Sequence, residues 1–93
     1  MPVSVRLPTV LRTHAGGLSE VSAEGATIGE VVDDVVRQFP GTANHLKAPD
    51  GALHRFVNVY LDDEDVRYLG GLDTPVSDGA EVSIVPAVAG GTG

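Results

Sequence analysis

The last seven residues of the sequence have the pattern that points most directly to a function. They follow Pro86 as Ala87-Val88-Ala89-Gly90-Gly91-Thr92-Gly93, and none carries a long side chain. Because glycine has no Cβ, Gly90 and Gly91 allow the backbone to pass close to surrounding walls. From Pro86 to Gly91 the chain spans at most about 20 Å when extended. Such a segment could enter a narrow channel in a partner protein, although a Gly-Gly pair alone more often marks a frayed terminus.

The other residue types that could do chemistry predict no catalytic, metal or cofactor site. The full sequence contains no cysteine, which excludes disulfides, thiol nucleophiles and thiolate zinc sites. His14, His45 and His54 are far apart in the sequence and lack the spacing of metal-binding motifs, so we expect surface histidines. The acidic run from Asp62 to Asp65 lacks the glycine and glutamate of an EF-hand loop and is interpreted as a solvated hairpin tip. Neither of the two earlier Gly-Gly pairs is followed by a lysine and a helix, so no ATP site is expected.

Charge and hydropathy argue against two further classes of function, nucleic-acid binding and membrane association. The formal net charge is −7, from 13 acidic and six basic residues. Binding to nucleic acid relies on neutralising phosphates with Lys and Arg, so this composition argues against it. An acidic surface is suited to a partner with a basic face, or serves only solubility. The sequence has no signal peptide and no apolar run near the roughly 20 residues of a membrane span, so we expect a cytoplasmic protein with no membrane partner.

The clearest predicted element is a helix over residues 28–39. Its apolar residues recur at helical spacing and form one stripe: Ile28, Val31, Val32, Val35, Val36 and Phe39. Thr27 stands at the N-cap with Glu30 three residues later, which is a capping box, and Pro40-Gly41 ends the helix. Because most helical stability comes from tertiary packing, we expect this valine-rich helix to lie against a sheet. Gly29 lies in the first turn, and the sequence offers no reason for it.

Alternating apolar and polar residues predict the strands around this helix. We expect strands at residues 3–9, 18–22, 54–61 and 81–85, and a short returning strand that opens at Val66 and Arg67. Pro8 indicates a strand end or an edge position. One sheet with one helix laid across it is the simplest arrangement of these elements. The sequence therefore predicts an α+β domain over residues 1–86, followed by a flexible tail over residues 87–93.

Three residues of the third predicted strand form a candidate partner-binding face. Phe56, Asn58 and Tyr60 alternate with an aliphatic set and so lie on the opposite face of the sheet. A sheet covered by one helix leaves its other face open, and aromatic residues are enriched in interfaces. These residues form either a docking surface or a set of side chains packed beneath a loop.

The segment from Leu72 to Gly91 resembles the C-terminal part of MoaD and ThiS proteins. It contains Thr74-Pro75-Val76, the Asp78-Gly79 turn, an alternating last strand and the Gly90-Gly91 pair. Within that family, the stretch from Leu53 to Arg67 is most similar to the CysO branch of actinobacteria. The resemblance implies a ubiquitin-like β-grasp fold, which is a mixed sheet with one main helix packed across it.

The resemblance also implies a sulfur carrier and not an enzyme. An E1-like adenylating enzyme of the MoeB/ThiF type would convert the terminal carboxylate to an acyl-adenylate. Sulfide or a persulfide would then displace AMP, and the thiocarboxylate on Gly91 would attack an electrophile held by a sulfur-acceptor synthase. The implied product is cysteine or another sulfur-containing metabolite, such as a thiosugar. In this interpretation Gly90 and Gly91 form the reactive end, while Ala87, Val88 and Ala89 contact the partner.

Two residues beyond Gly91 depart from the family pattern. In this chain the Gly91 carbonyl is in a peptide bond to Thr92 and offers no carboxylate to adenylate. We therefore expect a JAMM-type protease, which the CysO resemblance implies, to remove Thr92-Gly93; the alternative is that Gly93 is the carrying end. Two other functions stay open at this point: the small subunit of a molybdopterin synthase, and a non-covalent ubiquitin-like interaction module with an inert tail.

Overall fold

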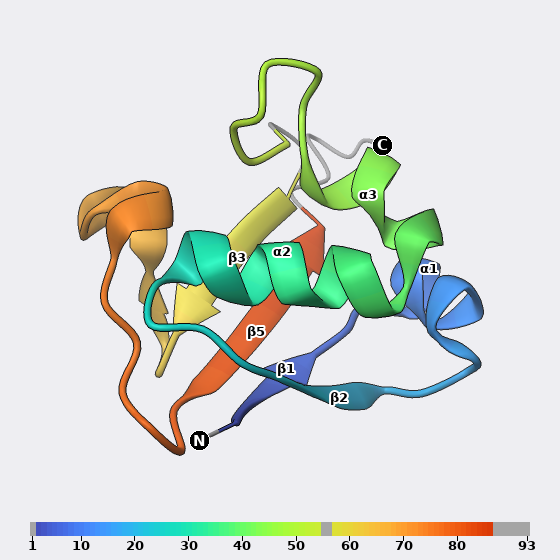
Figure 1. The fold of residues 1–93 in the computed structure, drawn as a ribbon, viewed down its shortest axis with the longest axis horizontal. Helices are drawn as coiled ribbons and strands as arrows, with labels where there is room; N and C mark the ends of the chain where they lie inside the picture. Colours follow the sequence, from blue (N-terminus) through green and yellow to red (C-terminus); the bar gives the residue numbers. More distant parts are fainter. Residues whose placement is uncertain (1, 55–56, 87–93) are drawn as a thin grey trace.

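A computed structural model describes residues 2–54 and 57–86. Figure 1 shows one long helix, α2 (Ile28–Gln38), lying across one face of a sheet. The five strands are β1 (Val3–Arg6), β2 (Glu20–Ala23), β3 (Val57–Leu61), β4 (Glu64–Asp65) and β5 (Glu81–Pro86), in the order β2-β1-β5-β3-β4. The β1–β5 pair is parallel and the other pairs are antiparallel, so the sheet is mixed.

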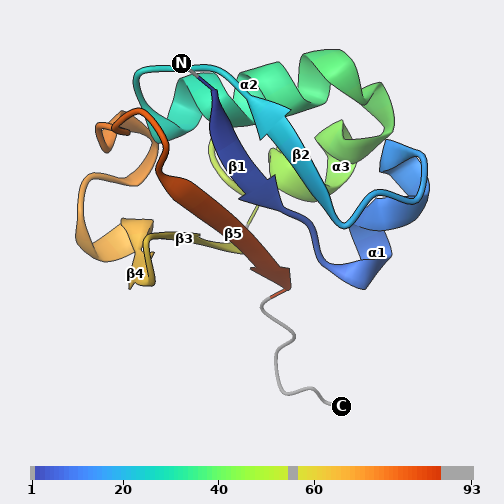
Figure 2. The ribbon, with the colours of Figure 1, turned by 90° about the horizontal axis from the view of Figure 1, so that it is seen from below.

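Short helical segments fill the connections. They are α1 (Thr9–Arg12), α3 (Ala43–Leu46) and four 3-10 turns: Thr13–Ala15, Pro40–Thr42, Val66–Tyr68 and Gly71–Asp73. Figure 2 shows α2 and α3 on the same side of the sheet, with β5 running between β1 and β3. In the part of the chain that the structure describes, no helix is long and apolar enough to span a membrane.

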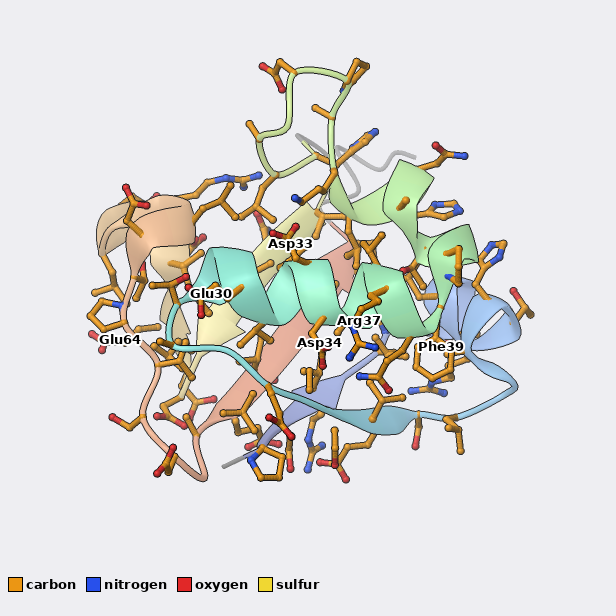
Figure 3. The ribbon with its side chains drawn as sticks, viewed as in Figure 1. Glu30, Asp33, Asp34, Arg37, Phe39 and Glu64 are labelled. Carbon is orange, nitrogen blue, oxygen red and sulfur yellow. The ribbon has the colours of Figure 1, made fainter. Side chains whose placement is uncertain are left out.

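The predicted helix is confirmed, and the sheet it covers explains its composition. Ile28, Val31, Val32 and Val35 are buried, and Val36 and Phe39 pack against the same core from its edge. The opposite side of α2 carries charged residues, among them Glu30, Asp33 and Arg37 in Figure 3. The Thr27 hydroxyl accepts a hydrogen bond from the Glu30 N–H at 3.2 Å, as a capping box requires. The Glu30 carboxylate, however, accepts from the N–H of Ala26 at 2.8 Å.

Gly29, which the sequence left unexplained, faces a close approach of the backbone. A Cβ at this position would lie 3.1 Å from the carbonyl oxygen of Leu72, in the 3-10 turn at Gly71–Asp73. The turn is fixed against the start of α2, since the Ile28 N–H donates to the Thr74 carbonyl at 2.9 Å. Glycine therefore lets residues 70–76 pack directly on the first turn of the helix.

Several predicted strand limits are wrong. β1 ends at Arg6 instead of residue 9, because Pro8 is the N-cap of α1, where buried Leu11 anchors a short helix. Pro8 thus marks a strand end, and β1 is an inner strand. β2 begins at Glu20, two residues later than predicted, and Leu18 before it is exposed.

The returning strand predicted at Val66 and Arg67 is also displaced. β4 consists of Glu64 and Asp65, and Val66–Tyr68 is a 3-10 turn. The Asp65 carboxylate accepts a hydrogen bond from the Arg67 N–H at 2.9 Å, which caps this turn and ends the strand. The side chain of Val66 is buried in the core, so the turn is held by packing as well.

Candidate functional site

The root of the C-terminal tail is the end of β5. Val82 and Ile84 of this strand are buried beneath α2, and β5 is hydrogen-bonded to β1 on one side and to β3 on the other. Its last residue, Pro86, is paired with Val57. The tail residues proposed to act, Ala87, Val88, Ala89, Gly90 and Gly91, lie outside the described residues, as do Thr92 and Gly93. The chain therefore leaves the sheet from an inner strand whose pairing with β1 ends at Ser83 and whose pairing with β3 continues to Pro86.

A mostly apolar hollow of about 100 Å³ lies beside this root. It is lined by Pro8, Val10, Leu11, His45, His54, Val57 and Pro86. Leu11 and Val57 are buried, whereas 57% of the surface of Val10 is exposed. Residues that are up to 78 positions apart in the chain meet here, so no local signal in the sequence predicted the hollow.

The histidines are closer together than the sequence suggested. The rings of His14 and His45 are in contact, with centroids 5.0 Å apart, and His45 and His54 line the same hollow. Among residues 2–54 and 57–86, no group of three or more His, Asp or Glu residues is arranged to hold a metal ion. His14 also lies against Gly41, where a Cβ would come within 2.8 Å of its Nδ1 atom. His14 and His45 are exposed, as the sequence predicted, and His54 is half-buried.

Two of the three residues of the candidate docking face lie in the part of the chain that the structure describes. Asn58 and Tyr60 are half-buried on the face of the sheet opposite to α2, and Phe56 lies outside the described residues. Asn58 accepts a hydrogen bond from the guanidinium of Arg67, which also donates to the backbone carbonyls of Val57 at 2.7 Å and His54 at 3.3 Å. Arg67 thus covers the part of the β3 edge that β4 leaves unpaired. The most exposed aromatic residue of the described chain is Tyr68, at 87%, which the sequence analysis did not single out.

The acidic hairpin tip is confirmed as a turn. Asp62 and Asp63 have positive φ angles of 49° and 75°, and they connect β3 to β4. Asp tolerates this conformation better than most residues do. The Asp62 carboxylate accepts a hydrogen bond from the Glu81 N–H at 3.0 Å, which ties the tip to the start of β5.

Asp34 of α2 is the acidic residue with the most perturbed environment. The guanidinium of Arg37 donates to its carboxylate, and so do the Glu24 N–H at 3.0 Å and the Gln38 amide at 2.9 Å. Arg37 first, and then the Glu24 N–H, hold the pKa of Asp34 below its usual value. Figure 3 shows Asp34 and Arg37 on the second half of α2, with Arg37 in the last turn, and neither residue lines the hollow. The contacts of Asp34 fix α2 to the end of β2 and take no part in the tail site.

Comparison with known proteins gives a consistent result. The sequence pattern of the ThiS family matches residues 5–91. The sulfur carrier protein CysO of Mycobacterium tuberculosis is 52% identical over 93 residues, which is 98% of this chain and 100% of that protein. The small archaeal modifier protein 3 of Haloferax volcanii is 37% identical over 68 residues, 73% of each chain.

A solved structure agrees with the sequence comparisons. A chain in the crystal structure of the Amycolatopsis orientalis BexX/CysO complex has a TM-score of 0.88 and 52% identity, covering 96% of this chain and 99% of that one. The mixed sheet with its helix is therefore the predicted ubiquitin-like β-grasp fold. This chain belongs to the ThiS family, and it is a ubiquitin-like sulfur carrier protein.

Proposed function

We propose that an E1-like enzyme adenylates this chain at Gly91, that the adenylate becomes a thiocarboxylate, and that the sulfur is donated in the biosynthesis of cysteine or a related metabolite. The observation that carries the proposal is the 52% identity with CysO along almost the whole chain. The chain acts as the co-substrate of two enzymes, the adenylating enzyme and a sulfur-acceptor synthase. The BexX/CysO complex supports the second role, because a similar carrier there is bound to another protein.

Residues 1–86 serve as the body of the carrier and residues 87–93 as its tail. The body holds the start of the tail on one edge, because Val85 and Pro86 pair with Asn58 and Val57 of β3. Gly90 and Gly91, with Ala87 and Ala89, suit a narrow channel because none has a side chain larger than a methyl group. The family pattern ends at Gly91 and leaves out Thr92-Gly93, which supports trimming by a JAMM-type protease before sulfur is loaded.

Intact mass spectrometry of two chains tests this function. The full chain and a chain that ends at Gly91 are each incubated with a purified E1-like enzyme, ATP and sulfide, without protease. The shortened chain should gain the mass that corresponds to replacing one oxygen by sulfur, and the full chain should not. Equal loading of both chains would show that Gly93 is the carrying end, and no loading of either would refute the sulfur-carrier role.

The open face of β3 is the second part of the proposed site. Asn58 and Tyr60 contact the adenylating enzyme from the face of the sheet that α2 does not cover, and Phe56, which lies outside the described residues, is assigned to the same contact by its alternation in the sequence. Tyr60 lies opposite Ser83 in the sheet, so its side chain is not part of the core beneath α2. Tyr60→Ala should weaken binding in titration calorimetry with little loss of stability, whereas Tyr68→Ala, the matched exposed tyrosine, should not. Unchanged affinity of the Tyr60 variant would rule this face out.

A further inference from the structure

The hollow beside the tail root has the chemistry of a socket for one side chain. Its floor is formed by Leu11 and Val57, which are 1% and 7% exposed, and its rim includes Val10 and Pro86. Figure 1 shows α1 and α3 next to each other at one end of α2, and the hollow lies between these short helices and the end of β5. Val10, at the rim of this hollow, is 57% exposed, so its side chain is accessible to a group that enters the hollow.

We propose that the hollow receives one aliphatic side chain of the adenylating enzyme, and that it thereby determines how the carrier docks on that enzyme. This inference rests on the proposed function. The first argument for it is the length of the tail. Five residues, from Ala87 to Gly91, reach at most about 18 Å beyond Pro86. An enzyme that encloses Gly91 in a buried site must therefore bring its own surface against the body of the carrier at Pro86, and Pro86 is part of the hollow.

The size of the hollow indicates what it accepts. A volume of about 100 Å³ is well above the ~10–15 Å³ that one water needs, so the hollow has room for a group of several atoms. That is the space of a few methyl and methylene groups, as in a Val, Leu or Ile side chain. The walls formed by Val10, Leu11 and Val57 favour an apolar group over a charged one, and His45 and His54 are the polar residues of the lining.

Two other occupants are conceivable, and each has a distinct outcome in the test. The tail of the same chain carries Val88, two residues beyond Pro86, and a second copy of the protein could also cover the hollow. If Val88 filled the hollow, the tail would have to leave it before entering the enzyme, and disrupting the hollow would make the carrier a better substrate. If a second copy filled it, the effect would depend on carrier concentration.

The variant Val10→Asp tests the proposal in the chain ending at Gly91. Val10 lies in the first turn of α1, where an acidic residue is compatible with the helix, and its exposure makes unfolding unexpected. Leu18→Asp is the matched control, because Leu18 is 51% exposed, lies outside the hollow and receives the same added charge. Far-ultraviolet circular dichroism verifies that both variants are folded. The measurement is the steady-state rate of ATP–pyrophosphate exchange by the purified E1-like enzyme, against carrier concentration.

We expect Val10→Asp to raise KM about tenfold or more and to leave kcat within about twofold, since burying a valine-sized group stabilises a complex by this factor. Leu18→Asp should retain the KM of the parent chain. Three kinetic results would each overturn the proposal: equal KM values for the two variants, a KM of Val10→Asp below that of the parent chain, or a loss confined to kcat. The proposal would also be wrong if the parent chain formed oligomers that Val10→Asp abolishes. If the parent chain itself supports no exchange, the proposed function fails and not only the docking inference.

Discussion

Gly25→Ala is expected to destabilise the body of the carrier although it adds only one methyl group. Gly25 precedes the N-cap of α2, and a Cβ there would lie 2.7 Å from both the Cβ of Glu30 and the backbone nitrogen of Val31. Non-bonded carbon atoms prefer separations of about 3.5–4.0 Å, so either the loop or the helix must move by nearly 1 Å. The helix cannot adjust easily because Ile28 and Val31 are buried beneath it.

The magnitude follows from two opposing effects. Forcing an extra carbon into a packed site costs about 1–3 kcal/mol, and the displaced loop weakens the hydrogen bond from the Ala26 N–H to Glu30, which is 2.8 Å long. Replacing glycine by alanine also restricts the unfolded chain, which offsets about 0.4–1 kcal/mol of this cost. We therefore expect the free energy of unfolding to fall by about 1–2 kcal/mol.

Gly29→Ala provides the matched comparison within the same helix. Its Cβ would meet one backbone oxygen, that of Leu72, at 3.1 Å, which requires a smaller adjustment. Alanine also gains about 1 kcal/mol over glycine inside a helix, so this variant should be close to neutral. Urea unfolding followed by circular dichroism measures both free energies, provided that the m-values agree. A Gly25→Ala chain as stable as the parent, or less affected than Gly29→Ala, would refute the steric argument.

Three further variants test other parts of the structure. Val35→Asp should leave the chain unfolded in circular dichroism, because it places an unpaired carboxylate at a fully buried position beneath the sheet; a folded variant would mean that the helix face is assigned wrongly. Asp34→Asn should lower stability by about 1 kcal/mol at neutral pH. Folding lowers the pKa of Asp34, so the carboxylate contributes its full stabilisation above the unfolded pKa near 4. That stabilisation is lost as the pH falls through the pKa of the folded protein. The free energies of unfolding of the parent chain and Asp34→Asn should therefore converge in acid. Arg67→Ala should speed amide hydrogen exchange around Val57 by removing the donor to its carbonyl, and equal exchange rates would contradict the role given to Arg67.

The helix and the inner strands could be predicted because their signals are local and repeated. The stripe from Ile28 to Phe39 extends over three helical turns, and the alternation in β5 places Val82 and Ile84 on one face. The short segments could not be predicted in the same way. In α1 only Leu11 is buried, and one apolar residue establishes no period. The turn at Val66–Tyr68 depends on a cap by Asp65 and on burial of Val66, and these features also fit a strand.

The sequence by itself determined the family and predicted the reactive end, because the motifs that carry them are contiguous: the strand that leads to Pro86 and the Gly90-Gly91 pair are read directly from the chain. Only the tertiary structure decided what surrounds the tail root. The hollow combines Pro8 and Val10 with His45, His54 and Pro86, and the β1–β5 pair is parallel, so it joins strands that are distant in sequence. Such long-range contacts leave no periodic trace in the sequence, because each depends on how the helix and the sheet pack together and not on the spacing of neighbouring residues.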